Sequence, residues 1–247
     1  MILLLDIGNS RVKWGILVVE GQIPRVESRS HRDHGIWDVA ESCWSDLSPT
    51  RVIASNVAGN NLAGELQEWV RITWQLEVEF LVPAVEAYGV INAYREPSRL
   101  GADRWAALLG AARRPHGHLC VVDCGTAVTI DVLSADNVHL GGLIVPGLRL
   151  MRDSLVAGTA GIRHTWGVEA ALLACDTGSA VAGGALYATI ALIDRVVADL
   201  TAELSAPVTI LLTGGDAALM LPLLAGTIEY EANLVLYGLA VVTGVWE

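Results

Sequence analysis

Two short segments of this 247-residue chain follow the same pattern, although more than a hundred residues separate them. In each, a run of apolar residues ends at an Asp-x-Gly turn with small polar residues, and apolar residues then recur at alternate positions. These segments are residues 3–16 and 120–132. A buried strand, a tight turn and a strand of period two explain the pattern. Twin hairpins this far apart favour two similar half-domains over a short-period repeat protein.

The rest of the sequence alternates between strand and helix patterns, which indicates an α/β protein with mixed sheets. Strands are predicted at 51–57, 77–82 and 208–212, and helices at 62–74, 103–113, 179–204 and from 217 onward. We expect Gly183 and Gly184 to mark a close packing contact. The predicted half-domains are residues 1–115, with the first turn, and residues 116–247, with the second turn and the loop at 213–216.

The formal net charge is −11, so the chain as a whole repels polyanions. Nucleic acid and anionic membrane surfaces are therefore not expected as partners. A phosphate-binding site would have to depend on local backbone N–H groups, a few Lys or Arg side chains and bound cations.

No membrane segment is predicted, although just over half of the residues are apolar. The run at residues 1–5 stops at Asp6 and is too short to span a bilayer. The stretch at 234–246 is interrupted by glycine and threonine, and we interpret it as a buried helix. The four cysteines show no CxxC spacing and are expected to be reduced and structural. The expectation is a soluble, cytoplasmic protein.

The first turn reads Asp6-x-Gly8-Asn9-Ser10, with Lys13 three residues further on. Backbone N–H groups and small polar side chains in such a turn can hold phosphate oxygens. A carboxylate at the strand end could hold Mg²⁺ directly or through water. The alternative is an ordinary hairpin with a polar turn.

The second turn, Asp123-x-Gly125-Thr126, repeats this chemistry and predicts a second phosphate contact across a cleft from the first. The loop at 213–216, Thr-Gly-Gly-Asp, lies between a predicted strand and a helix, where a nucleotide can approach the backbone closely. Chance recurrence of turn chemistry and a plain connecting loop are the alternatives.

Asp103 and Arg104 open a predicted helix and have two interpretations. One is a capped helix with a surface ion pair, which residue chemistry alone favours. The other is a general base that accepts a hydroxyl proton, beside an Arg that holds an anionic substrate.

Taken together, five motifs in this order resemble the type III pantothenate kinases. The motifs are residues 6–10, 101–104 (Gly-Ala-Asp-Arg), 123–129, 141–147 (Gly-Gly-Leu-Ile-Val-Pro-Gly) and 213–215. The resemblance covers nearly the whole chain. It implies the acetate kinase/sugar kinase/Hsp70/actin fold, with two half-domains around a central cleft. It also implies ATP-dependent phosphorylation of pantothenate to 4'-phosphopantothenate, the first step of coenzyme A biosynthesis.

The resemblance also implies roles for individual residues. Asp103 would be the general base, and Asp123 would bind a monovalent cation, K⁺ or NH₄⁺, which acts beside Mg²⁺. A homodimer is implied, with the substrate site near the subunit interface. Residues implied in ATP and phosphate binding are Asp6, Ile7, Gly8, Asn9, Ser10, Arg11, Val12, Lys13 and Thr126. Residues implied in pantothenate binding are Tyr94, Gly101, Ala102, Asp103, Arg104 and Thr177.

Two other functions fit the same fold. One is a non-catalytic regulator, against which the intact Asp6, Asp103 and Asp123 argue. The other is an enzyme of different specificity, such as a sugar kinase or a polyphosphate-type phosphatase. Sugar kinases of this fold are usually much longer.

Overall fold

The computed structural model describes residues 1–18, 23, 25–32, 35–163 and 169–244, and the chain divides into two compact units. Unit 1 consists of Met1–Pro115, Asn137–His139 and Asn233–Glu247. Unit 2 consists of His116–Asp136 and Leu140–Ala232. The predicted half-domains 1–115 and 116–247 differ from these units in two short segments, and as functional halves they remain a prediction.

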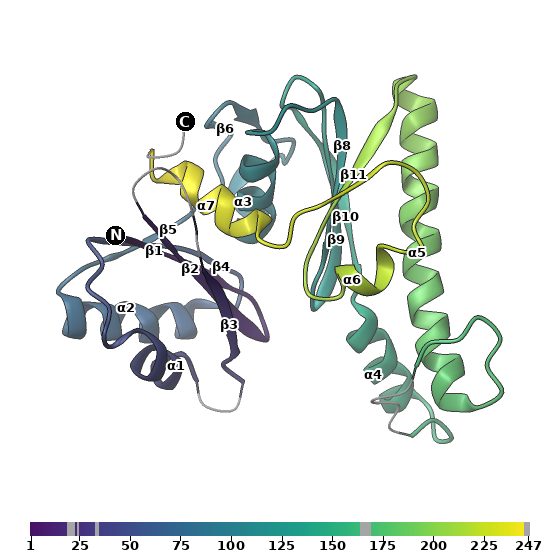
Figure 1. Cartoon of the computed structure of the whole chain (residues 1–247), viewed down its shortest axis with the longest axis horizontal. Helices are drawn as coiled ribbons and strands as arrows, with labels where there is room; N and C mark the ends of the chain where they lie inside the picture. The colour runs from purple at the N-terminus through teal and green to yellow at the C-terminus, as the bar shows by residue number, and fades with distance from the viewer. Residues whose placement is uncertain (19–22, 24, 33–34, 164–168, 245–247) are drawn as a thin grey trace. The chain divides into compact units, whose positions relative to one another are not determined.

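Unit 1 is built on a five-stranded sheet with the order β3-β2-β1-β4-β5 (Figure 1). β1 pairs antiparallel with β2 and parallel with β4. The strands are β1 (Ile2–Ile7), β2 (Arg11–Leu17), β3 (Val26–Ser30), β4 (Arg51–Asn56) and β5 (Val78–Phe80). A small antiparallel pair, β6 (Glu86–Ala87) and β7 (Val90–Ile91), and a 3-10 turn, η1 (Pro97–Arg99), follow.

Helices cover both faces of this sheet (Figure 1). On one face, α1 (Gly35–Trp44) and α2 (Asn60–Trp74) pack on alternate residues of β1, and this core holds Trp14, Trp44 and Trp69. On the other face lie α3 (Ala102–Ala111) and α7 (Leu234–Val242). The strand β1 is buried between these two helical layers, which explains why its apolar residues form a continuous run.

Unit 2 is built on a second five-stranded sheet with the order β10-β9-β8-β11-β12. The strands are β8 (His118–Cys124), β9 (Ala127–Leu133), β10 (His139–Pro146), β11 (Val208–Thr213) and β12 (Ile228–Tyr230). α4 (Leu148–Gly158) and α5 (Thr177–Leu204) pack on it, and α6 (Ala217–Met220) follows β11.

The two sheets have the same topology, which confirms the internal duplication predicted from the twin hairpins. β8 takes the place of β1: it pairs antiparallel with the next strand, β9, and parallel with β11. β11 and β12 correspond in the same way to β4 and β5. The α/β class with mixed sheets is therefore confirmed.

Most predicted elements are present with boundaries shifted by one to three residues. The strand predicted at 77–82 is shorter, at Val78–Phe80, and the buried helix predicted at 234–246 is α7, which ends at Val242. Residues 245 and 246 lie outside the described residues. A Cβ on Gly183 would meet the carbonyl oxygen of Ala171, so the expected close contact exists there. For Gly184 the expectation was wrong, because a Cβ there would have no neighbour within 4 Å.

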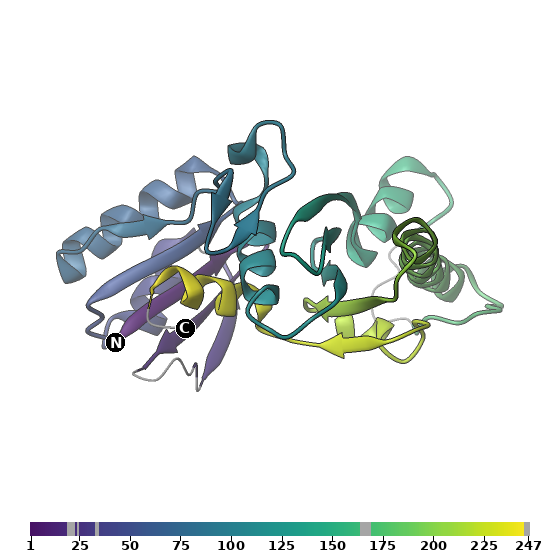
Figure 2. The same ribbon diagram turned by 90° about the horizontal axis from the view of Figure 1, so that it is seen from above.

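The C-terminal helix α7 belongs to unit 1 because it packs backbone to backbone on α3 (Figure 2). A Cβ on Gly238 would overlap the backbone of Ala106, and one on Gly110 would lie 2.7 Å from the carbonyl oxygen of Leu234. Two glycines thus let the helices approach more closely than side chains would allow. The short segment Asn137–His139 also belongs to unit 1. It is held there by a backbone hydrogen bond, which the amide of Ile91 donates to the carbonyl oxygen of Asn137 (3.1 Å).

One helix among the described residues, α5, is long and apolar enough by composition to cross a membrane, with a mean hydropathy of 1.5. Of its most apolar window, 44% is buried inside the protein. Leu186, Ile190 and Ile193 on this helix pack in the core of unit 2. We therefore interpret α5 as a core helix.

Candidate active site

Asp6 lies near the end of β1, between Lys13 on β2 and Ser55 on β4 in the strand register. The hydroxyl of Ser55, a fully buried residue, donates to Oδ1 of Asp6 (2.7 Å). Ser55 is absent from the sequence motifs, because only the parallel pairing of β1 and β4 brings it beside Asp6. This hydrogen bond fixes the carboxylate of Asp6 near the end of the first hairpin strand.

The environment of Asp6 raises the pKa of its carboxyl group from 3.8 to about 6. Desolvation by burial is the largest cause, and the negative charge of Asp103 adds to it. The hydrogen bond from Ser55 and the charge of Lys13 act in the opposite direction. The charge of Asp103 thus acts on the Asp6 carboxyl group, although the two residues lie 97 positions apart in the sequence.

Asp103 lies in the first turn of α3, and the backbone amide of Arg104 donates to its Oδ1 (2.7 Å). A Cβ on Gly101, the residue that precedes the helix, would lie only 2.6 Å from the same oxygen. The glycine thus makes room for the carboxylate. The capped helix start considered from the sequence is absent. The cap position is occupied by Gly101, which has no side chain to form a capping hydrogen bond.

Arg104 is 5% exposed, so the surface ion pair considered from the sequence is wrong. One of its terminal nitrogens donates to the hydroxyl of Tyr94 (2.7 Å), and the guanidinium lies 5.6 Å from the centre of the Tyr94 ring. The ring of His139, a buried residue, stacks on Tyr94 with centroids 6.0 Å apart. His139 belongs to no predicted motif, and its only signal in the sequence was its position just before the Gly141-Gly142 motif.

The first turn consists of Gly8, Asn9 and Ser10, and the amide of Gly8 closes it by donating to the carbonyl oxygen of Arg11 (3.0 Å). Two residues that follow β3 also contact this turn. His31 lies 2.7 Å from the carbonyl oxygen of Gly8, and Arg32 donates to the hydroxyl of Ser10 (2.6 Å). The remaining residues of the segment, Ile7 and Val12, are fully buried and anchor the hairpin in the core.

The second turn in unit 2 is one residue shorter and is packed closely by backbone. Asp123 lies near the end of β8, and a Cβ on Gly214 would lie 2.5 Å from its Oδ1. The amide of Gly147 donates to the carbonyl oxygen of Thr126 (3.0 Å). The motifs at 123–126, 141–147 and 213–216 thus converge on one place in unit 2, where Gly147 and Gly214 permit a close approach.

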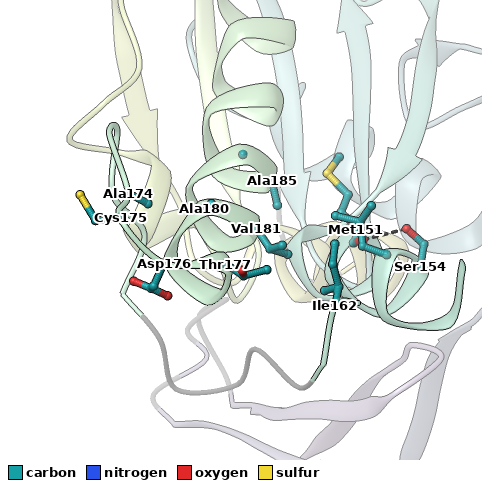
Figure 3. A pocket seen from close by; sticks show the side chains of 12 residues that line it. Met151, Ser154, Ile162, Ala174, Cys175, Asp176, Thr177, Ala180, Val181 and Ala185 are labelled. Carbon is teal, nitrogen blue, oxygen red and sulfur yellow. Dashed lines mark hydrogen bonds between the residues drawn. The ribbon is translucent and has the colours of Figure 1, made fainter. Parts of the chain in front are cut away.

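Thr177 lies apart from these residues, at the first position of α5. Asp176 caps this helix by accepting from the amide of Ser179 (2.9 Å). Both residues line a pocket of about 840 Å³ between α4 and the first turns of α5, with Met151 and Ser154 on its other side (Figure 3). Neither Asp123 nor Thr126 lines this pocket.

The structure therefore forms two groups from the predicted site residues. In unit 1 it joins the Asp6–Lys13 hairpin, Asp103 and the Arg104–Tyr94 pair. In unit 2 it joins Asp123 and Thr126 with the two glycine motifs. Carboxylates beside a turn with backbone N–H donors and a buried Arg can orient a hydroxyl group near a phosphate.

A duplicated α/β fold with an Asp-x-Gly hairpin at the same position in each half places the chain in the actin-like ATPase fold class. Solved structures agree on the fold. A Campylobacter jejuni protein assigned to the Baf family of transcriptional activators superposes on 98% of this chain and 96% of its own, with a TM-score of 0.62 and 23% identity. The activator of 2-hydroxyisocaproyl-CoA dehydratase from Clostridium difficile, with bound ADPNP, covers 97% and 92%, with a TM-score of 0.53 and 12% identity.

Sequence comparison identifies the family. The model of the type III pantothenate kinases matches residues 2–199. The type III pantothenate kinase of Nitrosococcus oceani is 44% identical over 248 aligned positions, which cover 97% of this chain and 92% of the relative. That of Laribacter hongkongensis is 40% identical over 240 positions, 97% of each chain. The chain belongs to the type III pantothenate kinase family.

Proposed function

We propose that this kinase transfers the terminal phosphoryl group of ATP to the hydroxyl of pantothenate, with Asp103 as the general base. The observation that carries the proposal is the position of Asp103 in the first turn of α3, where Gly101 leaves room for its carboxylate and where its charge acts on the Asp6 carboxyl group. A base must lie within reach of both the hydroxyl and the phosphate that the hydroxyl attacks. The amide of Arg104 orients the Asp103 carboxylate for this task.

Arg104 and Tyr94 would bind the pantothenate carboxylate, together with Gly101 and Ala102 at the start of α3. Support comes from the burial of Arg104, since a buried guanidinium offers strong, charge-assisted hydrogen bonds to an anion. The hydroxyl of Tyr94 holds the guanidinium in place. Thr177 would contact the substrate from the pocket between α4 and α5.

The Asp6–Lys13 hairpin would bind the ATP phosphates, and Thr126 would contact ATP from unit 2. Backbone N–H groups of the turn at Gly8–Ser10 and the ammonium group of Lys13 suit phosphate oxygens. Such local donors are required because the chain carries a net charge of −11. Phosphoryl transfer relies mainly on positioning and on compensation of negative charge.

Mg²⁺ fits the carboxylate pair, since a cation there would relieve the repulsion between Asp6 and Asp103. Within the part of the chain that the structure describes, no three His, Cys, Asp or Glu side chains form a metal cluster. Asp6 would therefore hold Mg²⁺ jointly with water and the ATP phosphates, which is the usual arrangement for this ion. When bound, Mg²⁺ would neutralise charge on the phosphates.

A monovalent cation, K⁺ or NH₄⁺, fits the surroundings of Asp123. One carboxylate lies there beside the backbone of the second turn, Gly147 and Gly214. Carboxylate and carbonyl oxygens are suitable ligands for a hard cation. The cation would offset phosphate charge on the side of unit 2.

A cytoplasmic homodimer would be the working form, acting on a small molecule and not on nucleic acid or membranes. The acidic charge of the chain supports the exclusion of polyanionic partners. Exposed Leu150 and Leu155 on α4 support association, because apolar side chains gathered on one helix favour burial. Size-exclusion chromatography with light scattering would test the dimer, and a monomer at micromolar concentration would contradict it.

The activity is tested by ADP release from the purified protein with ATP, Mg²⁺ and pantothenate, with and without K⁺. Release that depends on pantothenate and increases with K⁺ is expected. An Asp123→Asn variant should lose the stimulation by K⁺ and keep its fold. Folded protein that releases no ADP in response to pantothenate would contradict the proposed function.

A further inference from the structure

Two residues that follow β3 contact the first turn, Gly8–Ser10. Because β2 and β3 pair with Arg11 opposite Ser30, the residues after Ser30 continue alongside the turn that precedes Arg11. These residues are His31 and Arg32. Neither belongs to one of the five sequence motifs, and neither has a role in the proposed function.

His31 supports the turn from within the protein. Its side chain is 7% exposed, and Nε2 lies 2.7 Å from the carbonyl oxygen of Gly8. A carbonyl accepts hydrogen bonds, so Nε2 carries the proton and donates. A carbonyl oxygen repels phosphate, and the hydrogen bond that His31 donates to the carbonyl oxygen of Gly8 offsets part of this repulsion. The bond also fixes the backbone at the glycine on which the turn depends.

Arg32 reaches the turn from the solvent side. One terminal nitrogen donates to the hydroxyl of Ser10 (2.6 Å), and the side chain is exposed. A guanidinium has five N–H donors in a planar fork, so one bond to Ser10 leaves capacity for the paired oxygens of a phosphate. Ser10 thus holds a cation at the edge of the turn.

The arginines of β2 and β3, and Arg25 just before β3, make their described hydrogen bonds and ion pairs elsewhere. Arg11 donates to Ser28, Arg29 donates to Ser42 and Cys43, and Arg25 pairs with Glu27. Among the described arginines of this hairpin region, Arg32 is the one that donates a hydrogen bond to the turn at Gly8–Ser10. The chain is acidic, and the site contains the carboxylates of Asp6 and Asp103. A further positive charge beside the turn would therefore attract a phosphate that these carboxylates repel.

We propose that Arg32 is a phosphate-binding residue that contacts the outer phosphates of ATP, and that His31 is a positioning residue for the turn at Gly8. The inference rests on the proposed function for the identity of the nucleotide, and it adds a binding group outside the Asp6–Lys13 segment. The competing explanation is structural, with Arg32 as an ordinary surface side chain that tethers the hairpin.

The first experiment compares Arg32→Gln with Arg29→Gln, a matched removal of one exposed cation from the same hairpin. Nucleotide affinity is measured by calorimetry with ATP and AMP, without pantothenate. Loss of a charge-assisted phosphate contact should weaken ATP binding by about 10- to 100-fold. AMP binding should stay within about twofold, and Arg29→Gln should match the wild type within about twofold for both nucleotides. Arg32→Lys, which keeps the charge without the fork, should lie in between.

Two results would overturn the role of Arg32. One is ATP affinity in Arg32→Gln within twofold of Arg29→Gln, and the other is an equal loss for ATP and AMP. Because calorimetry omits pantothenate, an ATP effect in a protein that phosphorylates no pantothenate would uphold Arg32 and contradict only the proposed acceptor.

His31 is tested by His31→Gln, whose amide nitrogen can replace Nε2, against His31→Leu, which has no donor. The KM for ATP should rise at least about fivefold in the Leu variant and stay near the wild-type value in the Gln variant. The KM for pantothenate should stay constant in both. Equal KM values for ATP in the two variants would refute the positioning role.

Discussion

Replacing Asp6 with Asn should stabilise unit 1 at alkaline pH while it removes activity. The pKa of Asp6 rises from 3.8 in the unfolded chain to about 6 in the folded protein. This difference corresponds to about 3 kcal/mol of destabilisation by the ionised carboxylate. Asn keeps an oxygen that can accept the hydrogen bond from Ser55, and it carries no charge.

The direction of the pKa shift of Asp6 determines how stability changes with pH. A raised pKa means that Asp6 favours folding when protonated, so its contribution is complete below pH 3.8 and is lost as the pH rises through about 6. The free energy of unfolding of Asp6→Asn, minus that of the wild type, should therefore increase with pH. Between pH 5 and pH 8 this difference in the free energy of unfolding should increase by roughly 1.5 kcal/mol, about half of the full 3 kcal/mol.

Urea unfolding without divalent cations measures this difference. Tryptophan fluorescence is a suitable signal because Trp14, Trp44 and Trp69 lie in the core of unit 1. Asp46→Asn, which removes the same charge from an exposed position of unit 1, is the matched control. A pH-independent difference for Asp6→Asn would refute the reasoning that Asp6 is ionised at the cost of desolvation.

Four further substitutions, one of them a control, test the site and its support. Asp103→Asn should lower pantothenate-dependent ADP release by about 10²- to 10⁴-fold in a folded protein, and near-normal turnover would exclude Asp103 as the base. Gly101→Ala would place a methyl group 2.6 Å from Oδ1 of Asp103 and should lower kcat at least about tenfold. Gly64→Ala, with no neighbour within 4 Å inside α2, should leave kcat unchanged and raise stability by about 0.5–1 kcal/mol; a matching loss of kcat in both variants would contradict the steric argument. Gly238→Ala should destabilise unit 1 by at least about 2 kcal/mol in chemical denaturation, since its Cβ overlaps the backbone of Ala106, and unchanged stability would contradict the tight packing.

The local parts of the fold could be predicted from the sequence. Both hairpins appear in the pattern of residues because strand alternation and turn glycines act over a few positions. The duplication followed because two copies of that pattern imply two similar sheets. For the same reason the Asp6 and Asp123 turns could be recognised from the order of residues alone.

Contacts between distant segments could not be predicted. Ser55 reaches Asp6 only through the parallel register of β1 and β4. Tyr94 and His139 stack although they lie 45 positions apart. The burial of Arg104 depends on packing that no local pattern describes, and local chemistry therefore favoured the wrong alternative, a surface ion pair.

The close packing of α3 on α7 has a consequence for how the chain folds during synthesis. The helix that carries Asp103 ends at Ala111, whereas its packing partner begins at Leu234, about 120 residues later. At about 5–20 residues per second, the ribosome needs roughly 6–25 s to deliver that partner. The face of α3 that packs on α7 therefore stays exposed while the ribosome synthesises unit 2. The candidate catalytic residue Asp103 thus stands on the unit that is completed last. A nascent chain interrupted before α7 would carry every predicted site residue, but its unit 1 would be unfinished.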